Sequence, residues 1–345
     1  MITAVQLSDY VNITMRRLAR LPRARPRLRA AIVGALLVTL ASCASAPFPS
    51  GSPHPRPRPL GLPVNGRIIS SVLLPSYQGH VIQGERIYRV LYWSQGVPVS
   101  AYLSEPSRPG HYPLLVILHG GWPVRVHRHS DFGYSEAAVF AQVNPGMVQL
   151  YPEYEGYRRS HGQIRGIATD VQNTLDGILA ARALGEVNAS RLYLLGVSLG
   201  GGVALIVAGN IPQTRAVVAV SPWVGLVDNM TWLSEHPSGH LVQMAQFTDQ
   251  YGPNNIGLPS PSYQLRSPQV TRIQAPVLML QGTADHHVIW QTVQLFADQL
   301  KAAHKTYRLI LDPGGHHGLR HHYLNETAAQ VEQWFAKYGL TMTTY

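Results

Sequence analysis

The chain has 345 residues, of which 45% are hydrophobic and 13% are charged, and its formal net charge is +10. This composition is too apolar for a disordered chain, and no apolar run suits a protein that crosses a membrane several times. Residues 1–42 hold +6 of the charge, on seven arginines and one aspartate, so the remaining +4 gives no reason to expect a nucleic-acid partner.

The first 42 residues have the pattern of a signal peptide, with Met15 as an alternative start. Thirteen apolar or small residues, 30–42, follow the arginines; as a helix they would rise about 20 Å, too little to span a hydrocarbon core of roughly 30 Å. They lead directly to Cys43, the only cysteine of the chain. The ending Leu-Ala-Ser-Cys resembles the lipobox of bacterial lipoproteins, whose cysteine is lipidated and becomes the first mature residue.

We therefore expect a cell-envelope protein that is anchored by a lipid on Cys43, at the outer membrane facing the periplasm. The alternative is a secreted or periplasmic protein with a plain signal, or an uncleaved N-terminal anchor. Residues 43–65 are expected to be a linker, because residues 44–63 contain seven prolines, a density that favours an extended chain. One domain is expected over residues 66–345.

The domain is predicted to begin with antiparallel strands at 67–74, 85–93 and 97–103, which have alternating, β-branched and aromatic character. Short apolar runs then alternate with helical stretches, which is typical of an α/β fold with a mostly parallel sheet covered by helices on both faces. Strands are predicted at 114–118, 147–151, 192–195, 216–220, 277–280 and 307–311, and helices at 135–142, 167–184, 199–208, 289–303 and 326–338. Residues 222–270 interrupt this alternation.

The segment Gly196-Val197-Ser198-Leu199-Gly200 follows a predicted strand and opens a predicted helix. This is the setting of a nucleophile elbow, a sharp turn that exposes a reactive serine. Ser198 is the candidate nucleophile, and the N–H of Leu199, at the helix N-terminus, is a candidate donor to a developing oxyanion. A tight turn without chemistry is the alternative.

The segment beginning at His119 follows the strand that ends at Leu118 and contains two glycines and Trp122. It is similar to the loop that supplies a second oxyanion donor in such sites. Gly121 is the candidate donor, with Trp122 as the alternate. His119 is expected to be structural rather than a base.

An acid and a base should follow later strands, in the chain order Ser, Asp, His. Asp285 comes five residues after the strand that ends at Leu280, and the pair His316 and His317 follows the last predicted strand. We predict Asp285 as the acid and His317 as the base, with His316 as the alternate. No cofactor is needed for this chemistry. The sixteen histidines do not form a zinc motif, and no metal is expected.

At this point the chain resembles the α/β hydrolases, and within them the catalytic domain of the prolyl oligopeptidase family. Four stretches carry the resemblance: LHGGWP (118–123), YPEYEGYRRSHG (151–162), GVSLGGG (196–202) and YQLRSPQVTRIQAPVLMLQGTADHHV (263–288). The chain departs from the family in three respects. It leaves no room for an N-terminal β-propeller, it alters the YRGS-like element at 154–160, and it has Leu199 where many family peptidases have tyrosine.

The resemblance implies the α/β-hydrolase fold and a serine hydrolase that acts through an acyl-enzyme. A prolyl-oligopeptidase-like serine peptidase acting on small peptides is the first expectation, and a carboxylesterase acting on small esters is the second. A lipid-anchored binding module without catalysis is the third. Specificity is expected to reside in the loops 123–135, 155–165 and 222–270, with Trp223, Trp232 and Tyr263.

Overall fold

The structure of the protein, a computed structural model, describes residues 64–74, 84–127, 129–131, 146–184, 186–238, 240–253, 258–319 and 324–341. The expected signal peptide, Cys43 and almost all of the linker lie outside these residues, as does the helix expected at 135–142. No helix in the described ranges is long and apolar enough to cross a bilayer.

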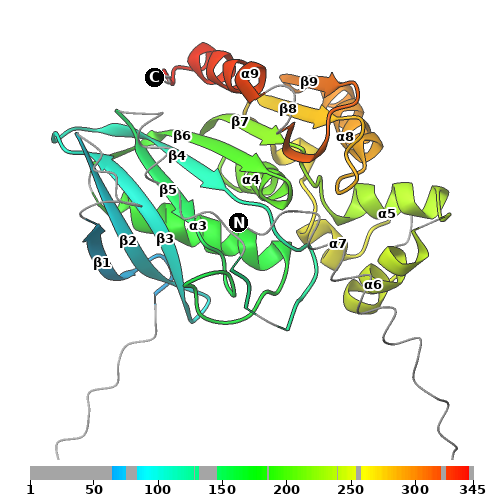
Figure 1. The fold of residues 1–345 in the computed structure, drawn as a ribbon, viewed down its shortest axis with the longest axis horizontal. Coiled ribbons are helices and arrows are strands. Elements are labelled where there is room, and N and C mark those ends of the chain that lie inside the picture. Colours follow the sequence, from blue (N-terminus) through cyan, green and yellow to red (C-terminus); the bar gives the residue numbers. More distant parts are fainter. Residues whose placement is uncertain are drawn as a thin grey trace, which may run out of the picture. The chain divides into compact units, whose positions relative to one another are not determined.

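Within the described residues, nine strands form one sheet in the order β1-β2-β3-β5-β4-β6-β7-β8-β9 (Figure 1). The strands are β1 (Ile68–Leu74), β2 (Glu85–Ser94), β3 (Val97–Pro106), β4 (Tyr112–Leu118), β5 (Val148–Pro152), β6 (Val187–Val197), β7 (Thr214–Val220), β8 (Val277–Gly282) and β9 (Tyr307–Asp312). β1, β2, β3 and β5 pair antiparallel in turn. The remaining pairs are parallel, so β5, β4, β6, β7, β8 and β9 all run in the same direction. The α/β class and the mostly parallel sheet predicted from the sequence are confirmed.

Burial of the strands follows their place in the sheet. β5 and β8 are buried at every residue, because they carry apolar side chains on both faces and have neighbours on both sides. The two outermost strands differ: five of the seven residues of β1 are exposed, and β9 is half-buried or exposed throughout. The sheet therefore has inner strands that are buried along much or all of their length and two incompletely covered edges.

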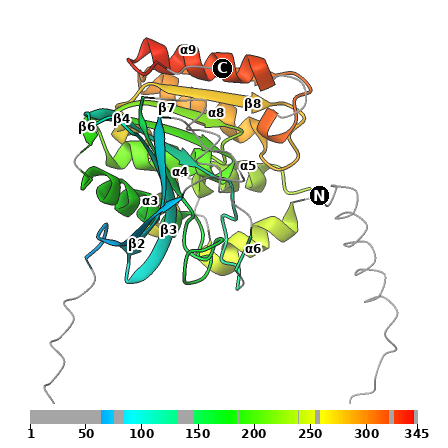
Figure 2. The same ribbon diagram turned by 60° about the vertical axis from the view of Figure 1, so that its left-hand side comes forward.

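Helices cover both faces of the sheet (Figure 2). The helices are α3 (Ile167–Arg182), α4 (Leu199–Asn210), α5 (Leu226–Glu235), α6 (Leu241–Tyr251), α7 (Pro261–Leu265), α8 (Trp290–Ala302) and α9 (Leu324–Lys337), with short 3₁₀ turns η1 (Val270–Arg272) and η2 (His317–Leu319). Residues of α3, α4 and α8 share one buried apolar cluster, whereas Trp334 and Phe335 of α9 belong to a second cluster with Tyr193. The two clusters correspond to the two faces of the sheet.

The interruption at 222–270 contains three helices, α5, α6 and α7, which the sequence analysis did not predict. Each is short, and only α7 has a sequence-visible start, since Ser260 caps it and Pro261 occupies its first turn. Trp223 and Tyr263 of this segment are 5% and 0% exposed. Both therefore pack in the core, and a role for them in substrate specificity stays a prediction.

Candidate active site

The turn between β6 and α4 holds Ser198 in a conformation that L-residues rarely adopt, with φ 59° and ψ −126°. The flanking glycines are needed because the backbone passes so closely here. A Cβ on Gly196 would lie 2.1 Å from the carbonyl oxygen of Gly200, and a Cβ on Gly200 would lie 2.2 Å from that of Leu118. The sequence pattern therefore produces the strained strand-to-helix turn that the elbow requires.

Two further glycines bring α4 close to the segment that follows β7. A Cβ on Gly202 would lie 2.1 Å from the carbonyl oxygen of Trp223, and a Cβ on Gly201 would lie 2.8 Å from Cβ of Pro222. The backbone of Ser198 is also held from this side. Its N–H donates to the carbonyl of Val220 at 2.9 Å, and its carbonyl accepts from the N–H of Trp223 at 2.9 Å.

The loop after β4 runs past the serine side chain. A Cβ on Gly120 would lie 3.1 Å from Cβ and 3.5 Å from Oγ of Ser198, so a side chain at this position would crowd the serine. Gly121 lies next to Leu199, since a Cβ there would be 3.2 Å from its Cδ2. The N–H of Trp122, the alternate donor, is already hydrogen-bonded to Oη of Tyr157 at 2.9 Å. Gly121 and Leu199 are therefore the stronger pair of candidates.

Two buried tyrosines, Tyr154 and Tyr157, hold this loop from behind. Tyr154 donates to the carbonyl of His119 at 3.3 Å, while Tyr157 accepts from Trp122 at the other end of the loop. The ring of His119 packs against that of Tyr154, with centroids 4.2 Å apart. Sequence reasoning missed Tyr157; the signal available was its place in the altered YRGS-like element.

His119 is almost fully buried, at 3% exposure. Burial lowers its pKa to about 4, so its ring is neutral near pH 7. Its Nδ1 lies 2.6 Å from the carbonyl oxygen of Gly120. These features fit a structural histidine that orders the loop.

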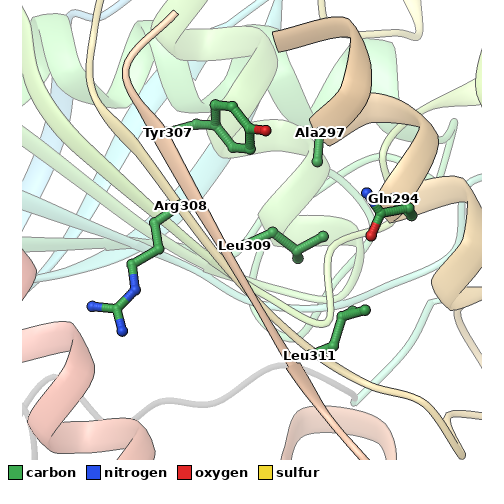
Figure 3. Close-up of a pocket in the computed structure, with 6 residues that line it drawn as sticks. All are labelled: Gln294, Ala297, Tyr307, Arg308, Leu309 and Leu311. Atoms are coloured by element: carbon green, nitrogen blue, oxygen red, sulfur yellow. The ribbon is translucent and has the colours of Figure 1, made fainter. Parts of the chain in front are cut away.

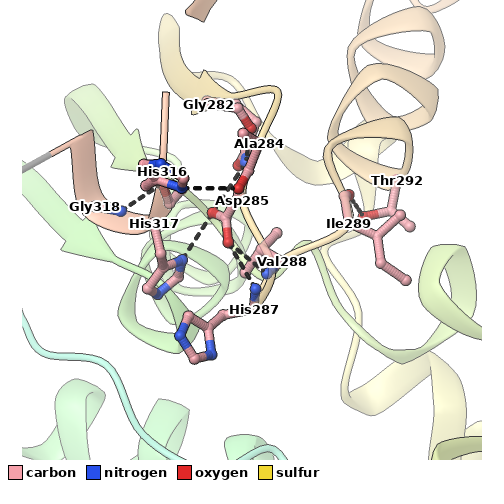
Figure 4. Close-up of polar contacts among 12 residues, drawn as sticks. Gly282, Ala284, Asp285, His287, Val288, Ile289, Thr292, His316, His317 and Gly318 are labelled. Atoms are coloured by element: carbon pink, nitrogen blue, oxygen red, sulfur yellow. Dashed lines mark hydrogen bonds and ion pairs between the residues drawn. The ribbon is translucent and has the colours of Figure 1, made fainter. Parts of the chain in front are cut away.

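The loops after β8 and β9 bring Asp285 and His317 together (Figure 4). Nδ1 of His317 lies 2.8 Å from Oδ2 of Asp285, and the His317 side chain is 25% exposed. The other oxygen of Asp285, Oδ1, accepts the backbone N–H groups of His287 at 2.8 Å and Val288 at 2.9 Å. Gln281 Nε2 donates to Oδ2 at 3.1 Å.

These donors decide the charge of Asp285. Its burial opposes ionisation, but the hydrogen bonds from His317, Val288 and His287 outweigh it, so the pKa of Asp285 lies below its ordinary value. The carboxylate is therefore charged at neutral pH and can stabilise a protonated imidazole at its side.

The alternate base, His316, points elsewhere. It is exposed, and its Nδ1 lies 3.2 Å from the carbonyl oxygen of Ala284, not near Asp285. The next residues explain the difference. Gly318 has φ 72°, and its N–H donates to Oγ of Ser221 at 3.0 Å, which ties the loop to the end of β7. The structure thus pairs His317, and not His316, with the acid.

Ser198, Asp285 and His317 follow β6, β8 and β9, which are parallel, so all three lie along the carboxyl-terminal edge of the sheet. In the part of the chain that the structure describes, no three His, Cys, Asp or Glu side chains are arranged to hold a metal ion. A hydrogen-bonded Asp–His pair and a strained serine turn on one edge of the sheet are the groups that acyl transfer by a serine requires.

Behind the tyrosines, Asp170 of α3 is fully buried at 0% exposure. Neither of its carboxyl oxygens has a hydrogen-bond partner among the described residues. Burial, and secondarily the charge of Glu155, raise the pKa of Asp170 well above its ordinary value. Glu155 itself pairs with Arg165 at 3.0 Å. The carboxyl of Asp170 is therefore favoured in its neutral form.

Glu153, which is buried and lies just before the loop 155–165, pairs with Arg158 of that loop. Its Oε1 lies 3.3 Å from Nε of Arg158. Arg158 also donates to the backbone carbonyl of Asp131 at 3.0 Å. Its guanidinium is thus engaged within the protein.

The chain is similar in sequence to proteins of a known family. The prolyl oligopeptidase family model matches residues 159–340, more than half of the chain. The uncharacterized peptidase YtmA of Bacillus subtilis is 28% identical over 244 residues, which cover 69% of this chain and 87% of that protein.

Two solved structures share the fold. Acetyl xylan esterase 1 from Thermoanaerobacterium superposes with a TM-score of 0.55 at 16% identity, over 78% of this chain and 88% of that one. The acylaminoacyl peptidase of Pyrococcus horikoshii has a TM-score of 0.56 at 17% identity, over 73% of this chain and 41% of that one. At these identities both are evidence for the α/β-hydrolase fold alone. With the family match over more than half of its length, the chain belongs to the prolyl oligopeptidase family and is a serine hydrolase.

Proposed function

We propose that the protein is a prolyl-oligopeptidase-like serine peptidase that acts on small peptides through an acyl-enzyme on Ser198. The observation that chiefly supports this is the 2.8 Å hydrogen bond between Asp285 and His317, on the sheet edge that also carries the strained Ser198 turn. Membership of the peptidase family and the likeness to a B. subtilis protein described as a peptidase favour peptides as substrates.

In the proposed mechanism, the Nδ1–H group of His317 donates a hydrogen bond to the carboxylate of Asp285, which leaves the unprotonated Nε2 as an acceptor for the hydroxyl proton of Ser198. Oγ of Ser198 attacks the substrate carbonyl while Nε2 takes that proton, and the N–H groups of Leu199 and Gly121 hold the resulting oxyanion. His317 then gives the proton to the leaving amine as its bond to carbon breaks. A water molecule, activated in the same way, hydrolyses the acyl-enzyme and restores the serine.

The nucleophile is tested with a fluorophosphonate probe, which labels activated serines covalently. Wild type should be labelled and Ser198→Ala should not. Ser234→Ala is the matched control, because this serine of α5 only donates to the carbonyl of Met230 and should leave labelling intact. Labelling that persists in Ser198→Ala would remove Ser198 from the mechanism.

A carboxylesterase acting on small esters is the second candidate, favoured by the shared fold with an acetyl xylan esterase over most of that chain. Turnover of aminoacyl- and prolyl-anilides is compared with turnover of p-nitrophenyl acetate, with Ser198→Ala as the blank. Anilide turnover supports the peptidase and ester turnover alone the esterase. Turnover of neither substrate by a labelled protein would point to other acyl groups, and the absence of both labelling and turnover would favour a non-catalytic binding module.

We also propose, from the sequence alone, that Cys43 is lipidated and anchors the domain at the outer membrane. Cells expressing the chain are fed an alkyne fatty acid, and the labelled protein is followed through membrane fractionation. Cys43→Ser should abolish the label and release the protein from the membrane fraction. A label that survives this substitution contradicts the proposal.

A further inference from the structure

Strand β9 forms an open edge of the sheet and borders a groove. In the described part of the chain, β9 pairs only with β8, so its other side carries unpaired backbone groups. A groove of about 590 Å³ runs beside it, lined by residues of β9 and of α8: Gln294, Ala297, Tyr307, Arg308, Leu309 and Leu311. Figure 3 shows Leu309 and Leu311 on the side of α8, and Arg308 pointing to the opposite side.

The backbone of β9 determines which residues can accept another strand. The N–H of Val277 donates to the carbonyl of Thr306, and the N–H of Thr283 donates to that of Asp312. Because backbone groups alternate in direction along a strand, the even-numbered residues of β9 face β8. Residues 307, 309 and 311 then direct their N–H and C=O groups outward, where a second strand could bind them.

The charges of β9 select the partner. The strand carries one positive side chain, Arg308, and one negative side chain, Asp312, four residues apart on the same face, with Ile310 midway between them. Arg308 is exposed, whereas Asp312 is half-buried and its Oδ2 lies beside Gly315 of its own loop. Its own copy, reversed about Ile310, presents the opposite charge at each of these positions. The other open edge, β1, has the uncharged sequence IISSVLL and offers no such selection.

We propose that β9 is the interface of a homodimer with two-fold symmetry, in which it pairs antiparallel with β9 of a second copy of this chain. Ile310 lies opposite the partner's Ile310, and Arg308 lies opposite the partner's Asp312 in both halves. Leu309 and Leu311 exchange backbone hydrogen bonds with the partner's Leu311 and Leu309. This register agrees with the backbone directions of β9. The pairs that exchange hydrogen bonds, 309 with 311, are outward-facing residues, and the charged pairs fall at the closer, non-hydrogen-bonded positions.

Neighbouring registers are worse. A shift that centres the pairing on Arg308 sets arginine against arginine, and one centred on Asp312 sets aspartate against aspartate. A pairing centred on Leu309 places Arg308 opposite the partner's Ile310 and leaves Asp312 without an opposite charge. The proposed register also places Leu309 and Leu311 of one copy beside Leu311 and Leu309 of the other, on the α8 side of the sheet. These leucines are half-exposed and line the groove. This association does not depend on the proposed chemistry of Ser198.

The test uses reciprocal charge reversal in the full-length chain, with sedimentation velocity as the readout. Arg308→Glu alone and Asp312→Lys alone each create two like-charge pairs in the dimer, which should raise its dissociation constant about tenfold or more. An equimolar mixture of the two variants should form heterodimers, because every pair is then of opposite charge. Arg108→Glu is the matched control: Arg108 is exposed, lies after β3, and its change alters the net charge equally.

The register is tested by cross-linking. Ile310→Cys should form a disulfide between two copies of residue 310 under mild oxidation, identified by mass spectrometry. Arg308→Cys should not, because residue 308 lies far from its own copy. Wild type treated in the same way accounts for Cys43, and any association through residues 1–63 is common to all variants.

Dimers that weaken in the single charge variants, reappear in the mixture and cross-link at residue 310 support the proposal. A chain that stays monomeric up to about 100 μM would overturn it. So would a dimer that none of these substitutions affects, since that dimer would use another surface.

Discussion

Asp285→Asn is expected to leave the fold in place and to remove most of the activity, because of how the donors around this carboxylate are divided. Oδ1 accepts two backbone N–H groups, from His287 and Val288, whereas Oδ2 accepts from Gln281 and His317. The asparagine oxygen must therefore stay at Oδ1, and its NH₂ group takes the place of Oδ2. That NH₂ group then faces Nδ1 of His317.

His317 can satisfy the new donor only if its Nδ1 becomes an acceptor, which moves the ring proton to Nε2. In this tautomer the ring can no longer take the hydroxyl proton of Ser198. Loss of the correct tautomer in a Ser-His-Asp triad costs about 10⁴ in kcat, or ~5.4 kcal/mol of transition-state stabilisation. Binding contacts are untouched, so KM should change little.

The assay is p-nitrophenyl acetate hydrolysis under saturating conditions, with circular dichroism to verify the fold. Asp249→Asn, an exposed aspartate of α6, is the control for loss of one charge and should behave as wild type. If Asp285→Asn retains kcat within tenfold of wild type, the orienting role of Asp285 is refuted.

The same residue predicts how stability depends on acid. Because the pKa of Asp285 is lower in the folded protein, its contribution to stability is present above the unfolded-state pKa of about 4 and is lost as the pH falls through the folded-state value. Asp285→Asn should lack this part of the acid limb in unfolding measured from pH 6 down to pH 2. An unchanged acid limb would contradict the lowered pKa.

Three further predictions concern the surroundings of the site. Tyr157→Phe removes the acceptor of the Trp122 N–H group, so kcat should fall about tenfold with little change in KM. The free energy of unfolding should fall by about 1–3 kcal/mol. An unchanged kcat would show that the loop does not need this hydrogen bond. Gly200→Ala places a Cβ 2.2 Å from the carbonyl oxygen of Leu118. The substitution should therefore lower the free energy of unfolding by about 3 kcal/mol or more and abolish fluorophosphonate labelling. A labelled variant with wild-type thermal stability would exclude this close approach. Asp170 has a raised pKa, so its contribution to stability is greatest below pH 4 and is lost, by about 1.4 kcal/mol per pH unit, as the pH rises towards the folded-state pKa. Asp170→Asn should therefore be more stable than wild type at pH 7, measured by denaturant titration. A variant that is less stable at both pH 5 and pH 7 would contradict this.

Much of the candidate site was predictable because its determinants are local. The G-x-S-x-G pattern between a strand and a helix predicts the elbow, since glycines at 196 and 200 are what allow the backbone to pass within contact distance of itself. The alternation of short apolar runs with helices predicts the parallel sheet, and parallel strands bring the loops after β6, β8 and β9 to one edge. Chain order alone then indicates where the acid and the base should be sought.

Contacts between distant segments were not predictable in this way. Of the three helices of 222–270, α5 and α6 have no side-chain cap at their starts. Trp223 and Tyr263, which were expected in a specificity loop, are buried in the core. Tyr157 was missed because its hydroxyl acts on Trp122, which lies 35 residues earlier in the chain.

The elbow at Ser198 could be inferred from the amino-acid sequence because it depends on neighbours within a few residues, whereas the fold class and the candidacy of Asp285 followed from the order of strands and helices along the chain. Of the two adjacent histidines, the sequence favoured His317 as the base and kept His316 as the alternate. The tertiary structure supplies the physical reason for this order: the left-handed turn at Gly318 and its hydrogen bond to Ser221, 97 residues away in the chain, accompany a His317 that pairs with Asp285 and a His316 that is exposed. A side chain's direction depends on where its loop is anchored, and here the anchor, Ser221, directly follows another strand, β7.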